Sequence, residues 1–64
     1  MFADNAGAQV NKQYFVWVGR DMVMDSRYRE AIETLNILLR ADPDAYEGYF
    51  WRGIAKYHLD DLLG

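Results

Sequence analysis

The side chains best suited to chemistry in this sequence are its one histidine, its one serine and a group of closely spaced carboxylates. A nucleophilic serine needs a base within hydrogen-bond reach, but Ser26 has no histidine near it in the sequence. His58 has no cysteine with which to share a metal, and the acidic residues that follow it, 60–61, are typical of a solvated turn. We therefore expect a structural or solvated role for His58 and no metal site.

The carboxylates of Asp42, Asp44 and Glu47 crowd a single turn, as in part of a calcium-binding loop. A calcium loop requires further oxygen ligands at later positions, which this segment lacks, and Pro43 interrupts the pattern. Helix capping explains the group better, with Asp44 accepting from a backbone N–H three residues on and Glu47 reaching back. Because the glycines form no phosphate-binding loop either, we expect no enzymatic activity and no cofactor.

The overall composition excludes several classes of function. The chain has 64 residues, no cysteine, 52% hydrophobic residues and a formal net charge of −3. Without cysteine it has neither disulfides nor cysteine-ligated zinc. Its basic residues are scattered, whereas nucleic-acid binding needs a basic patch, and no apolar run reaches the roughly 18 residues of a membrane span. The expected partner is a protein or peptide, with neither nucleic acid nor membrane insertion.

The sequence leaves the compartment open. Residues 1–8 lack the basic and apolar regions of a signal peptide, and a disulfide-free chain suits both cytosol and periplasm. We expect a soluble protein, cytoplasmic or, if cut from a secreted parent, periplasmic.

An internal repeat in the sequence predicts the helices that must carry any binding surface. A displacement of 34 residues places residues 17–19 (Trp-Val-Gly) on residues 51–53 (Trp-Arg-Gly), and it places Phe15 on Tyr49. A period of this length is typical of stacked helical hairpins. Apolar residues at three- and four-residue steps, with Pro43 ending the second element, predict three helices, at about 12–24, 27–41 and 44–59.

Residues 25–26 are expected to end the first helix and cap the second. Because the connections are short, consecutive helices should be antiparallel neighbours. Small side chains at Gly19 and Ala31 are expected to let the first two helices approach closely, with Leu35 among the residues that fill the space around them. Residues 1–11, rich in Ala, Gly, Asn and Asp, are expected to form a flexible arm.

The pattern as a whole resembles the tetratricopeptide repeat. The residues that carry the resemblance are Phe15, Val18, Gly19, Met22, Tyr28, Ala31, Leu35, Leu38 and Pro43. The resemblance implies an all-α antiparallel helix-turn-helix repeat, of the kind that stacks into an α-α superhelix, serving as a scaffold for protein–protein interaction. It divides the chain into a complete repeat over 12–45 and the first helix and turn of a truncated second repeat over 46–64. Arg52 and Lys56 depart from the family pattern.

The resemblance also implies a concave binding face formed by the first helix of each repeat. Its residues would be Gln13, Val16, Arg20, Val23, Glu47, Phe50, Ile54 and Tyr57. Core positions are an equally good interpretation of Val16, Val23, Phe50 and Ile54. Trp17 and Trp51 fit the rim of such a groove, although partial burial is the favoured interpretation. The family's clamp for acidic tails needs lysine and asparagine where this chain has other residues, so we do not expect an acidic ligand.

The third helix is not followed by the helix that would complete its repeat, so we expect the chain to be a fragment or the first unit of a longer array. Its uncovered side is expected to include Ala55, Leu59, Leu62 and Leu63, and to seek an equivalent surface in a homodimer or higher oligomer. Three hypotheses follow: a peptide-binding scaffold, structural self-assembly through this helix, or an accessory segment of a larger enzyme or envelope protein.

Overall fold

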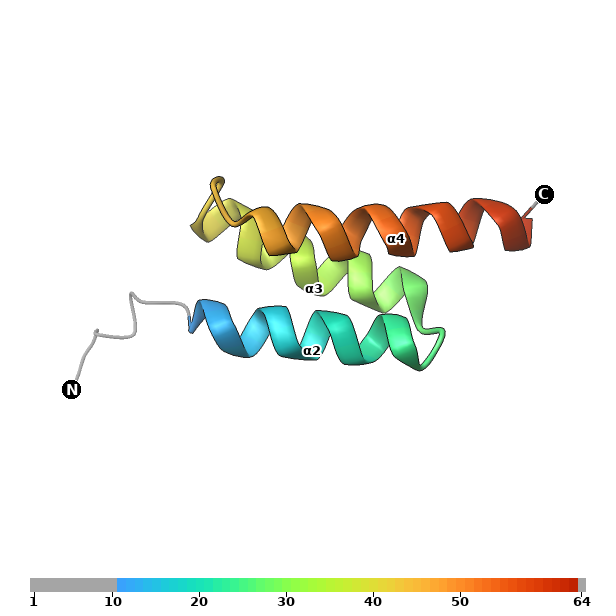
Figure 1. Cartoon of the computed structure of the whole chain (residues 1–64), viewed down its shortest axis with the longest axis horizontal. Coiled ribbons are helices and arrows are strands. Elements are labelled where there is room, and N and C mark those ends of the chain that lie inside the picture. Colours follow the sequence, from blue (N-terminus) through green and yellow to red (C-terminus); the bar gives the residue numbers. More distant parts are fainter. Residues whose placement is uncertain (1–10, 64) are drawn as a thin grey trace.

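The computed structural model describes residues 11–63. They form three α-helices, α2 (Lys12–Met24), α3 (Tyr28–Ala41) and α4 (Tyr46–Leu63). Each helix runs antiparallel to the one before it, and both α2 and α4 lie beside α3 (Figure 1). The predicted all-α fold with three antiparallel helices is confirmed. No helix in the described part of the chain is long and apolar enough to cross a membrane.

The first helix begins with a side-chain cap. The Asn11 side chain accepts a hydrogen bond from the backbone N–H of Tyr14, with an N–O distance of 3.1 Å. Asparagine is among the preferred residues at this position because its oxygen satisfies one of the free N–H groups of the first turn. Asn11, which the sequence pattern assigns to the arm, is therefore part of α2's start. The rest of that predicted arm, residues 1–10, lies outside the described residues.

The turn between α2 and α3 has the geometry of a Schellman motif. The N–H of Ser26 donates to Val23 O at 3.0 Å, and that of Arg27 donates to Met22 O at 2.8 Å. Ser26 takes the left-handed conformation that this motif requires, with φ of 63°. The prediction that residues 25–26 cap the second helix was wrong, because Arg27 occupies the cap position and no side chain bonds there.

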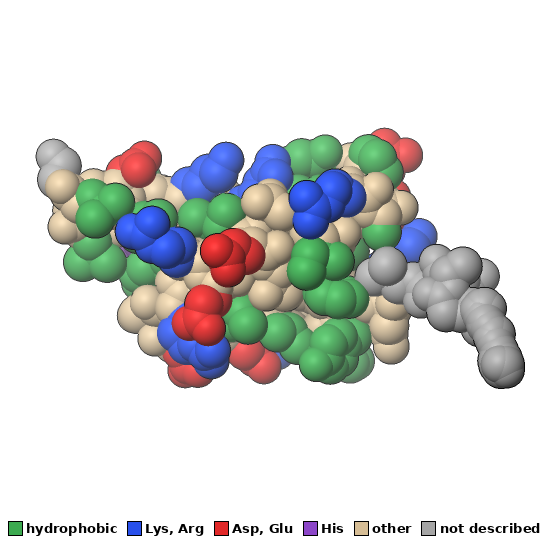
Figure 2. All heavy atoms as spheres, turned by 180° about the vertical axis from the view of Figure 1, so that it is seen from behind, with side chains coloured by type: hydrophobic (Ala, Val, Ile, Leu, Met, Phe, Trp, Pro, Cys, Tyr) green, Lys and Arg blue, Asp and Glu red, His purple; other side chains and the backbone are tan. Residues whose placement is uncertain are grey.

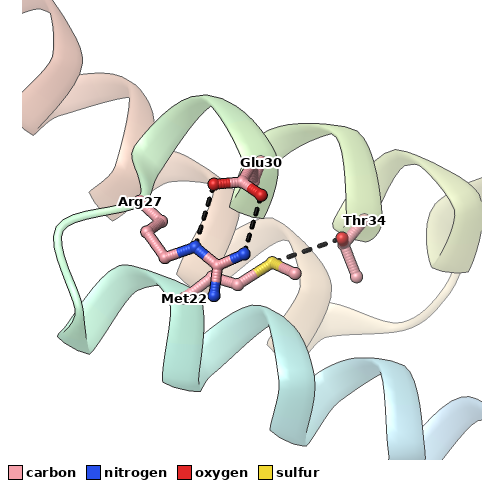
Figure 3. A network of polar contacts seen from close by, with 4 residues as sticks. All are labelled: Met22, Arg27, Glu30 and Thr34. Carbon is pink, nitrogen blue, oxygen red and sulfur yellow. Dashed lines mark hydrogen bonds and ion pairs between the residues drawn. The ribbon is translucent and has the colours of Figure 1, made fainter.

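An ion pair at this turn holds the start of α3 (Figure 3). Arg27 donates from Nε and Nη2 to the two carboxylate oxygens of Glu30, at 2.9 and 2.7 Å. The hydrogen bond to the guanidinium holds the pKa of the Glu30 carboxyl below its ordinary value. Further along α3, the Thr34 hydroxyl donates to the Met22 sulfur at 3.4 Å and so links α3 to α2.

The second turn is organised by Asp42 rather than by Asp44. The Asp42 side chain accepts from the backbone N–H of Asp44 at 3.1 Å, and the Tyr49 hydroxyl donates to Pro43 O at 2.9 Å. No hydrogen bond joins the Asp44 side chain to Glu47 among those the structure describes. The predicted capping box at Asp44 was therefore wrong, and α4 begins at Tyr46.

Two buried clusters make up the core. Val16, Leu35 and Leu38 form one, and Val23, Ala31 and Ala55 form the other. Trp51, half-buried, packs against both. The apolar residues that recur at three- and four-residue steps along α3 lie on its buried side, as predicted. Ala31, Leu35 and Leu38 belong to the two clusters, Tyr28 and Ile32 pack against the second, and Leu39 is also buried.

The last helix is longer than the sequence pattern indicates. Asp60 and Asp61, predicted to form a turn, lie inside α4, which continues to Leu63. Neither residue breaks a helix as glycine or proline would. The final part of α4 projects beyond the turn between α2 and α3 (Figure 1).

Candidate functional site

A pocket lies between the N-terminal ends of α2 and α4, beside the turn that joins α3 to α4. Its volume is about 210 Å³. It is partly open to solvent, and all three helices contribute to its wall. The lining residues are Lys12, Gln13, Val16, Leu38, Asp42, Asp44, Ala45, Tyr46 and Glu47.

The floor of this pocket is apolar and its rim is acidic. Val16 and Leu38 are buried members of the core, so they form the floor, whereas Glu47 and Asp44 are exposed at the rim. Lys12, the one basic residue of the lining, is paired with Asp42 at 3.4 Å. That pairing leaves the carboxylates of Asp44 and Glu47 as the excess charge of the pocket.

The pocket brings together residues from both halves of the predicted concave face. Gln13 and Val16 reach it from α2, and Glu47 reaches it from α4. The remaining predicted residues do not join them. On α2, Arg20 is half-buried and pairs with its neighbour Asp21 at 3.2 Å.

Burial separates the predicted binding residues that had two interpretations. Val16 and Val23 are buried, so both belong to the core, although Val16 also lines the pocket. Ile54 is half-buried and packs against the cluster around Val23. Phe50 and Tyr57 are exposed on α4 and lie outside the pocket.

The predicted self-association residues do not share one surface. Ala55 is fully buried against Val23 and Ala31, so its placement on an uncovered side was wrong. Leu59 is half-buried. Leu62 and Leu63 are exposed, and they lie in the projecting last turn of α4.

The two tryptophans have different environments. Trp51 is half-buried between the core clusters, as the favoured interpretation predicts, while Trp17 is 53% exposed on α2. Beside Trp51, Arg52 donates to the Asn36 side chain at 2.7 Å. This bond from α4 to α3 explains a basic residue where the family pattern favours an apolar one.

A row of exposed aromatic side chains lies on α4, and of its residues only Phe50 and Tyr57 were predicted to belong to a binding surface. The exposed fractions are 78% for Tyr46, 59% for Phe50 and 72% for Tyr57. Tyr49, on the same side of the helix, is 47% exposed. The Arg52 guanidinium carbon lies 5.3 Å from the centre of the Tyr49 ring, within range of a cation–π contact. The signal in the sequence was the three- and four-residue spacing of Tyr46, Tyr49 and Phe50, with Tyr57 two turns after Phe50.

His58 is exposed, and its ring lies against two aromatic side chains. Its ring stacks on Tyr28 with centres 5.1 Å apart, and it meets Tyr57 edge-on at 5.5 Å. Within residues 11–63 no group of three His, Cys, Asp or Glu side chains is placed to hold a metal ion.

The face opposite to that of Figure 1 carries charged side chains of both signs (Figure 2). Lys and Arg side chains are spread there among acidic and hydrophobic ones and do not gather into one basic patch (Figure 2). Mixed charge of this kind is typical of an ordinary solvated surface. The pocket and the aromatic row of α4 therefore remain the two candidate surfaces.

Comparisons with protein-family models, with curated proteins and with solved structures gave no significant match. The resemblance to the tetratricopeptide repeat therefore stays a prediction based on the residues of this chain.

Proposed function

We propose that this chain is a non-catalytic scaffold module of tetratricopeptide type that binds a protein or peptide. The pocket between α2 and α4 is its anchor site. One observation carries the proposal: Gln13 and Val16 of one helix and Glu47 of another line the same pocket. These are equivalent helices of the 34-residue repeat, and both were expected to contribute to a binding face.

The size of the pocket supports a peptide side chain as its occupant. Pockets that enclose small-molecule ligands usually measure about 300–1,000 Å³, and this one, at about 210 Å³, is smaller. A single long side chain of a partner protein fits the available space better than a cofactor does. Rigid helices on both sides keep the entropic cost of binding low, because the walls are already ordered.

The chemistry of the lining supports a basic side chain. Lysine and arginine combine an apolar stem with a charged end. The stem would lie on Val16 and Leu38, while the charged end would reach the carboxylates of Asp44 and Glu47. An acidic side chain would meet these two carboxylates without a free cation in the lining, since Lys12 is paired with Asp42.

An NMR titration tests this proposal. The probes are a short peptide of alternating leucine and arginine and a matched peptide with glutamate in place of arginine. We expect the backbone amide signals of Gln13, Val16 and Glu47 to shift with the basic peptide and not with the acidic one. Equal shifts with both peptides, or shifts with neither, would contradict the proposal.

A pair of variants shows whether the pocket carboxylate is responsible. Glu47→Gln keeps the shape of the side chain and removes its charge, so binding of the basic peptide should weaken by roughly three- to tenfold. Glu33→Gln makes the same change at an exposed position of α3 outside the pocket. It should leave the affinity unchanged.

A further inference from the structure

One side of α4 faces away from both other helices. A side chain at Gly53 would meet nothing within 4 Å, whereas Ala55 is fully buried. Successive residues of a helix are about 100° apart, so positions 53 and 55 point to nearly opposite sides. The face centred on Gly53 is thus the outer face of α4.

Glycine is a poor choice for an exposed helix interior, because it weakens the helix and packs against nothing. At the equivalent position 34 residues earlier, Gly19 lies against Leu35 of the next helix. A close approach by another helix explains Gly19, and the same explanation is available for Gly53 if the outer face of α4 is covered.

The residues around Gly53 form an arrangement that is complementary to itself. Positions three, four and seven residues to either side share its face. Before Gly53 these are Phe50, Tyr49 and Tyr46, and after it they are Lys56, Tyr57 and Asp60.

We propose that two copies of the chain pack α4 against α4 in an antiparallel, two-fold symmetric homodimer centred on Gly53. In that arrangement the residues after Gly53 lie beside the residues before it on the partner, and those on the same lateral side of the interface meet. Lys56 then lies beside Tyr49, a cation–π pair. Tyr57 lies beside Phe50, an aromatic pair.

The outermost pair has the same complementarity. Tyr46 faces Asp60, so a phenolic hydroxyl donates to a carboxylate, which is a charge-assisted hydrogen bond. Each pair occurs twice, because a two-fold interface uses one patch on both subunits. A parallel pairing would instead place Lys56 against Lys56 and Asp60 against Asp60. The charges therefore favour antiparallel over parallel packing of the two α4 helices.

Part of this surface is already held in place. The Tyr49 hydroxyl is bonded to Pro43 O, and its ring lies beside the Arg52 guanidinium, so little side-chain freedom is lost on association. The proposal keeps the predicted self-association through α4. The contact surface, however, is the side of α4 opposite Ala55 and not the side that includes it. Only Tyr46 also lines the peptide pocket, so the sedimentation test relies on other positions.

Sedimentation equilibrium measures the association. We expect the wild-type chain to reach twice its monomer mass as its concentration is raised. Gly53→Glu should stay monomeric, because it places a charge and a long side chain at the two-fold axis. Its folding should be unaffected, since the side chain meets nothing within 4 Å in the monomer, and an unchanged helical circular dichroism spectrum checks this.

The matched control is Ile37→Glu, which replaces an exposed apolar residue of α3 by the same charged one. It should dimerise as the wild type does. A wild-type chain that stays monomeric at millimolar concentration would overturn the proposal. So would a Gly53→Glu variant that still dimerises, because the contact would then lie elsewhere.

Single cysteines test the orientation, since the chain has none of its own. A disulfide needs Cα atoms within about 7 Å of each other. Gly53→Cys meets its own copy in either orientation, so its crosslinking shows only that this face is the contact. Mixing Tyr46→Cys with Asp60→Cys should give the mixed dimer in preference to either self-crosslinked species. Preferential self-crosslinking of Tyr46→Cys would overturn the antiparallel arrangement.

Discussion

Leu35 occupies the space that a side chain at Gly19 would fill. A Cβ atom built on Gly19 would lie 2.7 Å from Leu35 Cγ, closer than carbon atoms can approach. Leu35 is fully buried, so it has little room to move away. This contact fixes how closely α2 and α3 pack, as the small residue at position 19 predicts.

Alanine substitutions at the two equivalent glycines should have opposite effects. Gly19→Ala should lower the free energy of unfolding by about 1–3 kcal/mol through overpacking. Gly53→Ala, with open space around its Cβ, should raise it by about 0.5–1 kcal/mol through better helix propensity. Urea denaturation at a protein concentration low enough to keep the chain monomeric measures both. A gain in stability from both changes would show that Leu35 adapts freely.

The turn between α2 and α3 offers a stabilising substitution. Ser26 adopts a left-handed φ of 63°, which costs a residue with a Cβ about 1–2 kcal/mol and costs glycine almost nothing. Ser26→Gly should therefore raise the melting temperature in thermal unfolding followed by circular dichroism. Ser26→Ala is the control, because it removes the hydroxyl that accepts from Tyr28 at 3.2 Å but keeps the Cβ. It should give no gain, and an equal rise for both variants would count against backbone strain as the cause.

The ion pair between Arg27 and Glu30 should make stability depend on pH. Because the pKa of Glu30 is lowered in the folded state, its contribution is fully present above the ordinary carboxyl pKa. That contribution is lost as the pH falls through the lowered value, where the folded protein too takes up the proton. Arg27→Met should raise the pKa of Glu30 towards its ordinary value, measured by an NMR titration of the side-chain carboxyl.

The control for this titration is Arg29→Met, which removes a neighbouring exposed charge that makes no hydrogen bond in the described structure. It should shift the titration of Glu30 far less than Arg27→Met does. Equal shifts would mean that general charge, rather than the two bonds to the guanidinium, lowers the pKa.

The hydrogen bond from Arg52 to Asn36 should contribute to the packing of α4 on α3. Arg52→Ala leaves the half-buried Asn36 oxygen without this partner, at an expected cost of about 1–2 kcal/mol of unfolding free energy. A double-mutant cycle with Asn36→Ala should show a coupling of at least about 0.5 kcal/mol. Arg40→Ala, an exposed arginine at the end of α3, should change the stability little. Additive effects of Arg52→Ala and Asn36→Ala would show that the bond contributes nothing.

The sequence predicts α3 better than α4 for a physical reason. In α3, polar residues such as Glu30 and Glu33 separate the apolar positions cleanly, so Ala31 and Leu35 can be assigned to the core. In α4, aromatic and apolar side chains occur on every side, so spacing alone does not decide which face is buried. The misplacement of Ala55 follows from that ambiguity.

The candidate site was predictable only in part. The repeat identified Gln13 and Glu47 as residues that could share a surface, because equivalent positions of stacked helices lie side by side. The role of Asp42 in the second turn depends on local backbone geometry that the residue types do not determine. The same holds for the start of α2 at Asn11, since a capping asparagine and an asparagine in a loop look alike in the sequence.

The position of Trp51 makes the folding of the three helices interdependent. Its indole packs against both core clusters, so removal of α4 would expose both at once and leave α2 and α3 with too little apolar cover to persist as a hairpin. We expect a single cooperative unfolding transition, with tryptophan emission and helical ellipticity lost at the same denaturant concentration. The three helices then form one cooperative folding unit that depends on α4. Any array built on this chain would have to grow from three helices rather than two.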